Sequence, residues 1–205
     1  MSFNRKKKDV VIAKKGLVLC NIGDGKGKTT AAIGQAIRAS GAGLNVYILQ
    51  FVKAKPKPAE EQESGEWPVS NEVHFFDNAK LPTGLGKIVC EQVGEGFVGI
   101  LGDRKQKDRH IREALRGLEL ARQIITRREY QLVVLDEILS AVDLGLLTED
   151  DIIELIKNKP ADIHLMLTGH KKYPSIFKYC DTVTEMKNLK HAYYEGVLAQ
   201  IGIDF

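Results

Sequence analysis

Short apolar runs alternate with segments of helical periodicity along most of the chain. Runs of strand length cover residues 16–21, 46–52, 132–135, 163–167 and 182–186, the last expected as a central strand, and a further short strand is predicted at 72–76. The run at 46–52 is apolar at nearly every position, which is typical of a strand in a parallel sheet covered on both faces. The alternation predicts an α/β fold with a mainly parallel central sheet flanked by helices.

Helical segments fall between these runs. Residues 28–40 predict a helix that ends at Gly41, and residues 174–179 predict a short one. The clearest helix covers 103–128, where apolar side chains recur on one face at Ile111, Leu115, Leu118, Ala121 and Ile125. Another helix begins after Thr148, which we expect to form a capping box with Asp151, and it ends at Pro160.

Three segments lack such periodicity. Residues 1–15 are basic, with Arg5 followed by three lysines, and we expect an arm outside the core. Residues 53–71 hold three prolines and several glutamates, and residues 78–102 hold six glycines; both are expected to be mobile loops. The remainder, 16–205, is expected to form a single domain.

Composition narrows the class of protein. The 205 residues carry 30 Lys and Arg against 27 Asp and Glu, a net charge of +3 that does not by itself argue for nucleic-acid binding. The three cysteines form no C-x-x-C pair, so neither a zinc site nor a disulfide framework is indicated, and reduced thiols are expected. No apolar run approaches the length of a membrane span or of a signal peptide. We therefore expect a cytoplasmic protein that does not bind membranes.

The strongest chemical signal is a glycine-rich loop between the first predicted strand and the first predicted helix. It reads Gly23, Asp24, Gly25, Lys26, Gly27, Lys28, Thr29 and Thr30. Such a loop turns backbone N–H groups toward phosphate oxygens, and the following helix presents its positive dipole end to the same anion. Lys28 adds a full positive charge, and the Thr29 hydroxyl can bind Mg²⁺. The loop is one residue shorter than G-x-x-x-x-G-K-[ST], because Ile22 stands where the first glycine is usual. The alternative is a glycine-rich turn that binds nothing.

The apolar run at 132–135 ends in Asp136 and Glu137. A carboxylate after a buried strand is the expected partner of a phosphate loop, because it holds Mg²⁺ directly or through water. The sequence therefore predicts a magnesium site made by Thr29, Asp136 and Glu137. On its own, the same pattern would indicate only a strand that ends in a charged turn.

These residues resemble the P-loop ATP:corrinoid adenosyltransferases, bacterial enzymes that adenosylate cobalamin and its precursors. The resemblance runs from about residue 16 to residue 205. It rests on the shortened loop 23–32, on segments 37–41, 49–53, 135–138 and 167–169, and on the C-terminal residues 190–193 and 196–205.

The resemblance implies a RecA-like P-loop fold and a homodimer. It also implies that the triphosphate of ATP lies in the loop while Co(I) of the corrinoid attacks the ribose 5′-carbon and triphosphate leaves. Lys28, the loop amides and Mg²⁺ would neutralise the leaving triphosphate. Arg38 would contact the nucleotide, and Phe97 would contact the corrinoid. A flavoprotein that reduces Co(II) would supply the nucleophile.

Two positions depart from the family pattern. The family's F-x-W pair reads Phe97-Val98-Gly99, so glycine replaces the tryptophan that helps remove the lower cobalt ligand. The family's T-G-R reads Thr168-Gly169-His170, and a histidine carries a less constant charge than arginine.

Three other functions are compatible with parts of the sequence. A small-molecule kinase or nucleotide hydrolase could use the same loop. A corrinoid- or nucleotide-binding protein without catalysis would suit the changes at Gly99 and His170. A nucleic-acid-dependent ATPase would use the basic residues of the 103–128 helix, but glutamates lie among them and no aromatic residues do, which favours an ordinary solvated face. Those basic residues are Arg104, Lys105, Lys107, Arg109, Arg112, Arg116 and Arg122.

Overall fold

A six-stranded, entirely parallel sheet forms the centre of the computed structural model, which describes residues 15–53, 71–96 and 107–204. The strand order is β3-β2-β4-β5-β1-β6. The strands are β1 (Val18–Ile22), β2 (Val46–Gln50), β3 (Ile88–Gln92), β4 (Leu132–Asp136), β5 (His164–Thr168) and β6 (Thr182–Glu185). The predicted α/β fold with a parallel sheet is confirmed.

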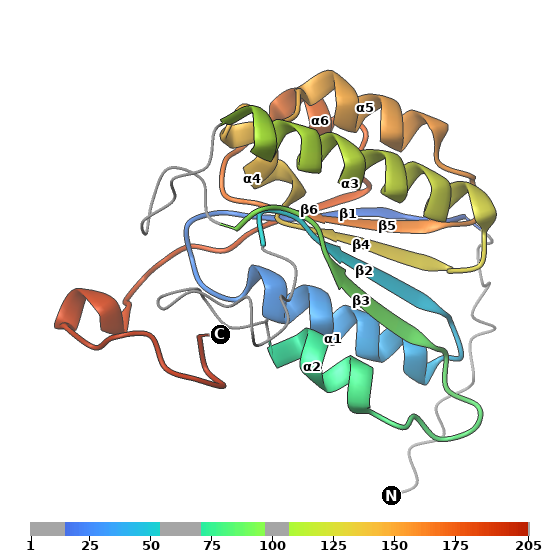
Figure 1. Ribbon diagram of the computed structural model, residues 1–205, viewed down its shortest axis with the longest axis horizontal. Helices are drawn as coiled ribbons and strands as arrows, with labels where there is room; N and C mark the ends of the chain where they lie inside the picture. Colours follow the sequence, from blue (N-terminus) through green and yellow to red (C-terminus); the bar gives the residue numbers. More distant parts are fainter. Residues whose placement is uncertain (1–14, 54–70, 97–106, 205) are drawn as a thin grey trace, which may run out of the picture.

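Helices cover both faces of the sheet (Figure 1). One face carries α1 (Lys28–Gly41) and α2 (Asn71–Asn78). The other carries α3 (Lys107–Arg127), α4 (Ile138–Asp143), α5 (Glu149–Asn158) and α6 (Pro174–Phe177). The C-terminal segment, with the 3₁₀ turn η2 (Ala192–Glu195), extends beside the edge of the sheet where the strands end.

The apolar side chains divide into two cores, one on each face. In β2, Tyr47 and Leu49 belong to the core beneath α3, α4 and α5, while Val46 and Ile48 belong to the core beneath α1 and α2. Successive side chains of a strand point to opposite faces, so a strand buried on both sides must be apolar at nearly every position. The uninterrupted apolar runs of the sequence follow from this arrangement.

The beginnings of two helices match local sequence signals. The helix α1 begins at Lys28, directly after Gly27, whose φ of 111° is readily adopted only by glycine. The helix α5 begins with the predicted capping box: the Asp151 N–H donates to Thr148 Oγ1 (3.2 Å), and the Thr148 N–H donates to Asp151 Oδ2 (2.8 Å).

Residues 72–76, predicted as a strand, lie instead in helix α2, so that prediction is wrong. The side chains of Val73 and Phe76, three residues apart, pack on the core beneath α1. Three-residue spacing is helical, but one turn is too short to show a period in the sequence.

The predicted loop at 78–102 is wrong in its middle, where β3 pairs with β2. Glycines on both sides of this short strand made the whole segment look like a loop in the sequence. The strand β6 is also not central, because it lies at the sheet edge and pairs only with β1. The helix α4 was not predicted.

The residues 1–14 of the basic arm, most of the proline-containing segment (54–70), and residues 97–106 with Phe97 and Gly99 lie outside the described residues. Within the described parts of the chain, no helix is long and apolar enough to cross a membrane.

The capping box yields a stability prediction. Replacing Thr148 with Ala removes the acceptor for the Asp151 N–H, so we expect the free energy of unfolding to fall by about 1 kcal/mol. Urea denaturation of Thr148→Ala measures this. Thr126→Ala is the control, because the Thr126 hydroxyl donates only to the Arg122 carbonyl inside α3. Equal stability losses in the two variants would contradict the capping role.

Candidate functional site

The glycine-rich loop that follows β1 is seated on the backbone of two other segments. The Gly23 N–H donates to the His170 carbonyl (3.0 Å), and the Gly25 N–H donates to the Met186 carbonyl (2.9 Å). Gly23 has a φ of 112°, and a Cβ atom there would lie 2.2 Å from the Met186 oxygen. Only glycine fits this close approach. The chain after β5 and the chain after β6 therefore fix the shape of the loop.

Lys28 lies directly under this loop, at the first residue of α1. Its side chain is buried, with the residue 6% exposed, and Nζ donates to the Gly25 carbonyl at 3.0 Å. The first N–H groups of a helix have no partner within the helix and point toward any anion at its end. The helix end and the Lys28 ammonium together give this place the positive charge and N–H donors that a polyanion such as a triphosphate requires.

Asp136 ends β4, and the strand β5 separates it from β1. Three neutral groups donate to its carboxylate: the Thr29 hydroxyl (3.0 Å), the Thr168 hydroxyl (2.8 Å) and the Gln50 amide (3.2 Å). The Lys53 ammonium lies 3.8 Å away. Asp136 is 1% exposed, and burial raises the pKa of its carboxyl above the ordinary value, while Lys53 opposes that shift.

Glu137 follows Asp136 but points its carboxylate elsewhere. Its backbone has a φ of 60°, the left-handed region, and its N–H donates to the Thr168 hydroxyl at 2.7 Å. Its side chain accepts a hydrogen bond from the Ser140 hydroxyl and lies 3.9 Å from His170 Nε2. The structure thus places Asp136 beside Thr29, and Glu137 beside Ser140 and His170.

The oxygen donors near the loop suit a hard cation that also binds phosphate. Thr29 and Asp136 offer a hydroxyl and a carboxylate in direct contact. Within the described residues, no cluster of three or more His, Cys, Asp or Glu side chains could hold a metal by itself. Mg²⁺ fits such a partial set, because it is usually held by one or two protein oxygens together with waters and substrate phosphates.

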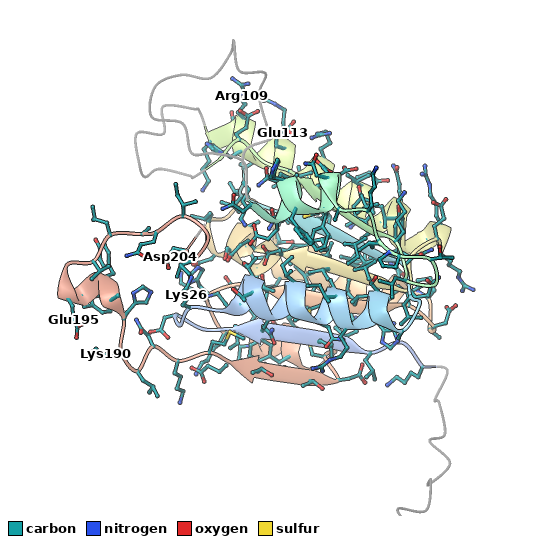
Figure 2. All side chains as sticks on the ribbon, turned by 90° about the horizontal axis from the view of Figure 1, so that it is seen from below. Lys26, Arg109, Glu113, Lys190, Glu195 and Asp204 are labelled. Carbon is teal, nitrogen blue, oxygen red and sulfur yellow. The ribbon has the colours of Figure 1, made fainter. Side chains whose placement is uncertain are left out.

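The side chains of Arg38 and Lys26, both predicted to contact the nucleotide, do not lie beside Lys28 and Asp136. Arg38 is exposed in the last turn of α1, ten residues after Lys28 and thus about 15 Å along the helix. Lys26 turns outward: its ammonium lies 3.0 Å from Asp204 Oδ1 and donates to the Ile203 carbonyl at 2.6 Å, which ties the loop to the C-terminal segment (Figure 2). Asp24 and Thr30 are exposed.

Sequence reasoning did not assign roles to Gln50, Lys53 and Thr168, which surround Asp136 in the structure. A signal was present: Gln50 and Thr168 are polar residues at the carboxyl ends of otherwise apolar strands. Neighbouring parallel strands end at the same edge of the sheet, so such residues meet there. The Met186 carbonyl contacts the loop through the backbone. Because every residue has such a carbonyl, the residue type at position 186 could not predict this contact.

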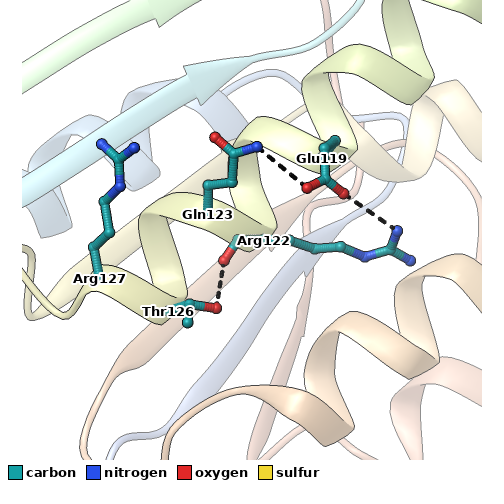
Figure 3. A pocket seen from close by; sticks show the side chains of 5 residues that line it. All are labelled: Glu119, Arg122, Gln123, Thr126 and Arg127. Carbon is teal, nitrogen blue, oxygen red and sulfur yellow. Dashed lines mark hydrogen bonds and ion pairs between the residues drawn. The ribbon is translucent and has the colours of Figure 1, made fainter.

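Three basic side chains of α3, those of Arg109, Arg116 and Arg122, are paired with carboxylates. Arg116 binds Glu113 (2.8 Å), and Arg122 binds Glu154 of α5 (3.2 Å). The shallow depression on this helix is lined by residues of α3 alone, again with arginine beside glutamate (Figure 3). Its lining residues are Glu119, Arg122, Gln123, Thr126 and Arg127. This pairing supports a solvated helix face rather than a nucleic-acid surface.

The close approach at Gly23 can be tested against another glycine. Gly23→Ala forces a Cβ against the Met186 carbonyl, so we expect a loss of stability above about 1 kcal/mol and a loss of ATP binding. Gly34→Ala is the control: it lies in α1 with no atom within 4 Å of its added Cβ, and should stabilise by about 0.5–1 kcal/mol. Calorimetry measures both effects. Undiminished ATP affinity in Gly23→Ala would contradict the seating of the loop.

Comparison with known proteins agrees with this geometry. The family model described as ATP:corrinoid adenosyltransferase BtuR/CobO/CobP matches residues 14–205. A corrinoid adenosyltransferase of Pseudomonas aeruginosa is 33% identical over 94% of this chain and 85% of its own length. One from Escherichia coli K12 is 30% identical over 94% of this chain and 87% of its own.

A solved structure from work on a type III secretion system ATPase is also similar, over 89% of this chain and 53% of its own. Its identity is 13% and its TM-score 0.46, too distant to carry an argument. The family model, by contrast, spans nearly the whole chain, including the phosphate loop and the Asp136 site. The chain belongs to the BtuR/CobO/CobP family of ATP:corrinoid adenosyltransferases.

Proposed function

We propose that this chain transfers the 5′-deoxyadenosyl group of ATP to the Co(I) centre of a corrinoid and releases inorganic triphosphate. The bond that forms joins cobalt to the 5′-carbon, and the bond that breaks joins that carbon to the triphosphate oxygen. Family membership supports the reaction class. The observation that carries the proposal is the phosphate loop seated over the buried Lys28 ammonium.

The residues around the loop suit this reaction because the protein need not supply a nucleophile. Co(I) carries the electron pair that attacks the carbon. The chain must hold that carbon in line and stabilise the charge on the leaving triphosphate. Lys28 and the loop N–H groups would do the second. Lys28 donates to the Gly25 carbonyl, and a bound phosphate would take over that contact.

We propose that Mg²⁺ binds with the triphosphate, held by the Thr29 hydroxyl and the Asp136 carboxylate. When bound, it neutralises phosphate charge as a Lewis acid. Glu137 was also predicted to bind Mg²⁺. Its carboxylate contacts Ser140 and His170 rather than Thr29, which supports a place next to the metal ligands and not among them. Arg38 and Phe97 remain predicted contacts of nucleotide and corrinoid. A cytoplasmic location, supported by free cysteines, and a flavoprotein that reduces Co(II) complete the proposal.

The reaction can be tested anaerobically with ATP, Mg²⁺ and chemically reduced Co(I) cobalamin, followed by visible spectroscopy. We expect a light-sensitive alkyl-cobalt spectrum. Lys28→Ala should slow its appearance by on the order of 10²-fold or more, because a charge that stabilises the leaving group is lost. Lys87→Ala is the matched control, since Lys87 is exposed before β3 and should leave the rate unchanged.

Other outcomes would identify the alternatives. Formation of ADP or inorganic phosphate without corrinoid would indicate a kinase or hydrolase. An unchanged Co(I) spectrum with ATP tightly bound would indicate a binding protein, or one specific for another corrinoid. Equal rates in Lys28→Ala and Lys87→Ala would contradict the assigned role of the loop.

The homodimer is also proposed, supported by apolar side chains on the C-terminal segment. Leu189 is 94% exposed, and Tyr194, Leu198 and Ile201 are each 78% exposed. An exposed apolar group of this kind is usually covered in an assembly. Light scattering should give twice the 22.8 kDa of one chain, and replacement of Leu198 and Ile201 by Ser should shift the mass toward one chain. A parent protein of 22.8 kDa in solution would contradict the proposal.

A further inference from the structure

A row of polar side chains crosses the sheet where its strands end. Gln50 of β2 stands directly opposite Gln92 of β3 and Asp136 of β4, and Thr168 of β5 stands opposite Asn21 of β1. Leu135 pairs with Leu167, so Asp136 and Thr168 are neighbours as well. All five residues of the row are buried, from 0% exposed at Gln50 to 8% at Asn21.

The row lies on the sheet face that α1 covers. Two residues before Gln50, Asp136 and Thr168 along their strands are Ile48, Val134 and Met166, and these belong to the core beneath α1. Residues two apart in a strand share a face. The helix α1 begins with the loop lysine and with Thr29, which donates to Asp136. The row therefore reaches the phosphate site from the side of the sheet, through Asp136.

Two hydrogen bonds along this row run in the same direction. The Gln92 Nε2 group donates to Gln50 Oε1 (3.3 Å), and the Gln50 Nε2 group donates to Asp136 Oδ2 (3.2 Å). An ionised carboxylate only accepts, so Gln50 must present its NH₂ group to Asp136. Its carbonyl then requires a donor, which Gln92 supplies. Asp136 thus sets the orientation of both amides, and both amide dipoles point their positive ends toward it.

This direction accounts for an unusual atom at the end of the row. Among the described residues, Gln92 Oε1 is buried without a hydrogen-bond partner. Such an atom costs free energy and needs an explanation. If the amide of Gln92 were reversed, its carbonyl would face the Gln50 carbonyl. Two acceptors would then repel each other, and the Gln92–Gln50 hydrogen bond would be lost. The unpartnered oxygen therefore lies at the outer end of a hydrogen-bond chain, in which Gln92 donates to Gln50 and Gln50 donates to the Asp136 carboxylate.

The backbone after Gln50 is also strongly constrained. Val52 has a φ of 60°, which is a genuine outlier for a β-branched residue, and the Phe51 N–H donates to the Asp136 carbonyl at 2.8 Å. Gly94 packs closely on this corner: a Cβ atom there would lie 3.2 Å from the Val52 nitrogen. Strained backbone persists where surrounding contacts over-determine it, and it is common at functional sites. Here it fixes the end of β2 against Asp136.

We propose that Gln50 is a positioning residue, which holds one oxygen of Asp136 so that the carboxylate presents its remaining lone pairs to the metal–triphosphate complex, and that Gln92 orients Gln50. This inference rests on the proposed function, in which Asp136 helps to hold Mg²⁺. The Thr168 hydroxyl restrains the other carboxylate oxygen at 2.8 Å. In this role Gln50 and Gln92 act through Asp136 rather than by contact with the substrate.

The alternative is that the two glutamines have only a structural role in the core. The two roles differ in what a substitution changes. Loss of a residue with a purely structural role affects the stability of the fold. A positioning residue also affects the advantage that Mg²⁺ gives to ATP binding, and it affects this only while Asp136 is a carboxylate.

The test measures the dissociation constant of ATP by calorimetry in Mg²⁺ and in EDTA, with the full chain. The ratio of the dissociation constant in EDTA to that in Mg²⁺ gives the factor by which the metal strengthens ATP binding, called the metal advantage. Gln50→Met keeps the length of the side chain and removes its hydrogen bonds to Asp136 and Gln92, so we expect the ratio to fall by about tenfold, as for loss of one hydrogen bond to a charged group. Gln92→Met acts one step further out and should lower the ratio by about threefold. Affinity in EDTA should stay unchanged.

Ser40→Ala is the matched control. Ser40 is 3% exposed in the last turn of α1, and its hydroxyl donates to the Gly86 carbonyl at 2.6 Å, away from the row. This variant should lower the melting temperature without changing the ratio. In an Asp136→Asn background, Gln50→Met should produce no further change, because the group through which it acts has been removed.

The outcomes separate this inference from the proposed function. If Asp136→Asn leaves the ratio unchanged, the proposed metal site is wrong. If Asp136→Asn lowers the ratio while Gln50→Met and Gln92→Met do not, only the positioning role is wrong. If Gln50→Met does not fold, Gln92→Met and its double variant with Asp136→Asn decide the question. An equal effect of Gln92→Met with and without the Asp136 carboxylate would overturn the inference.

Discussion

A carboxylate shielded almost completely from water is the constraint on which the site depends. Asp136 is 1% exposed, and a charge in such a place is tolerated only where donors surround it. The donors come from three separate parts of the chain: Thr29 at the start of α1, Gln50 and Lys53 at and just after the end of β2, and Thr168 of β5. Any change in the packing of these elements alters the surroundings of one charge, so the sheet and the phosphate site form a single unit.

The fold satisfies this constraint because every strand runs in the same direction. Parallel strands bring their carboxyl ends to one edge, and there the buried residues change from apolar to polar. The phosphate loop is held at the same edge by carbonyl groups of His170 and Met186. The glycine-rich loop is thus seated on segments that follow the ends of β5 and β6, and these contacts are made by backbone groups rather than by side chains.

Much of this could be predicted from the sequence, and the exceptions have physical causes. The strands β2 and β4 and the capping box of Thr148 carry strong local signals, and the structure confirms them. The strand β3 did not, because glycines surround it and its pairing with β2 is a long-range contact. The loop and Asp136 were predicted as site residues from residue type and spacing, and the structure brings Thr29 of the loop into contact with Asp136. Gln50 was missed because its importance comes from register with Asp136, which only the folded sheet reveals.

The position of β1 within the sheet has a consequence for how the chain is made. Its two neighbours, β5 and β6, occupy residues 164–168 and 182–185, so the strand that leads into the phosphate loop has no partner while the chain between them is being synthesised. Pairings of such large sequence separation form slowly, since closing the intervening loop has a high entropic cost. Until β5 emerges from the ribosome, β1 has neither of its partner strands and is an unpaired apolar strand that a chaperone could protect. A half-made chain therefore lacks both the partner strands of β1 and the His170 and Met186 carbonyls that hold the glycine-rich loop in the folded structure.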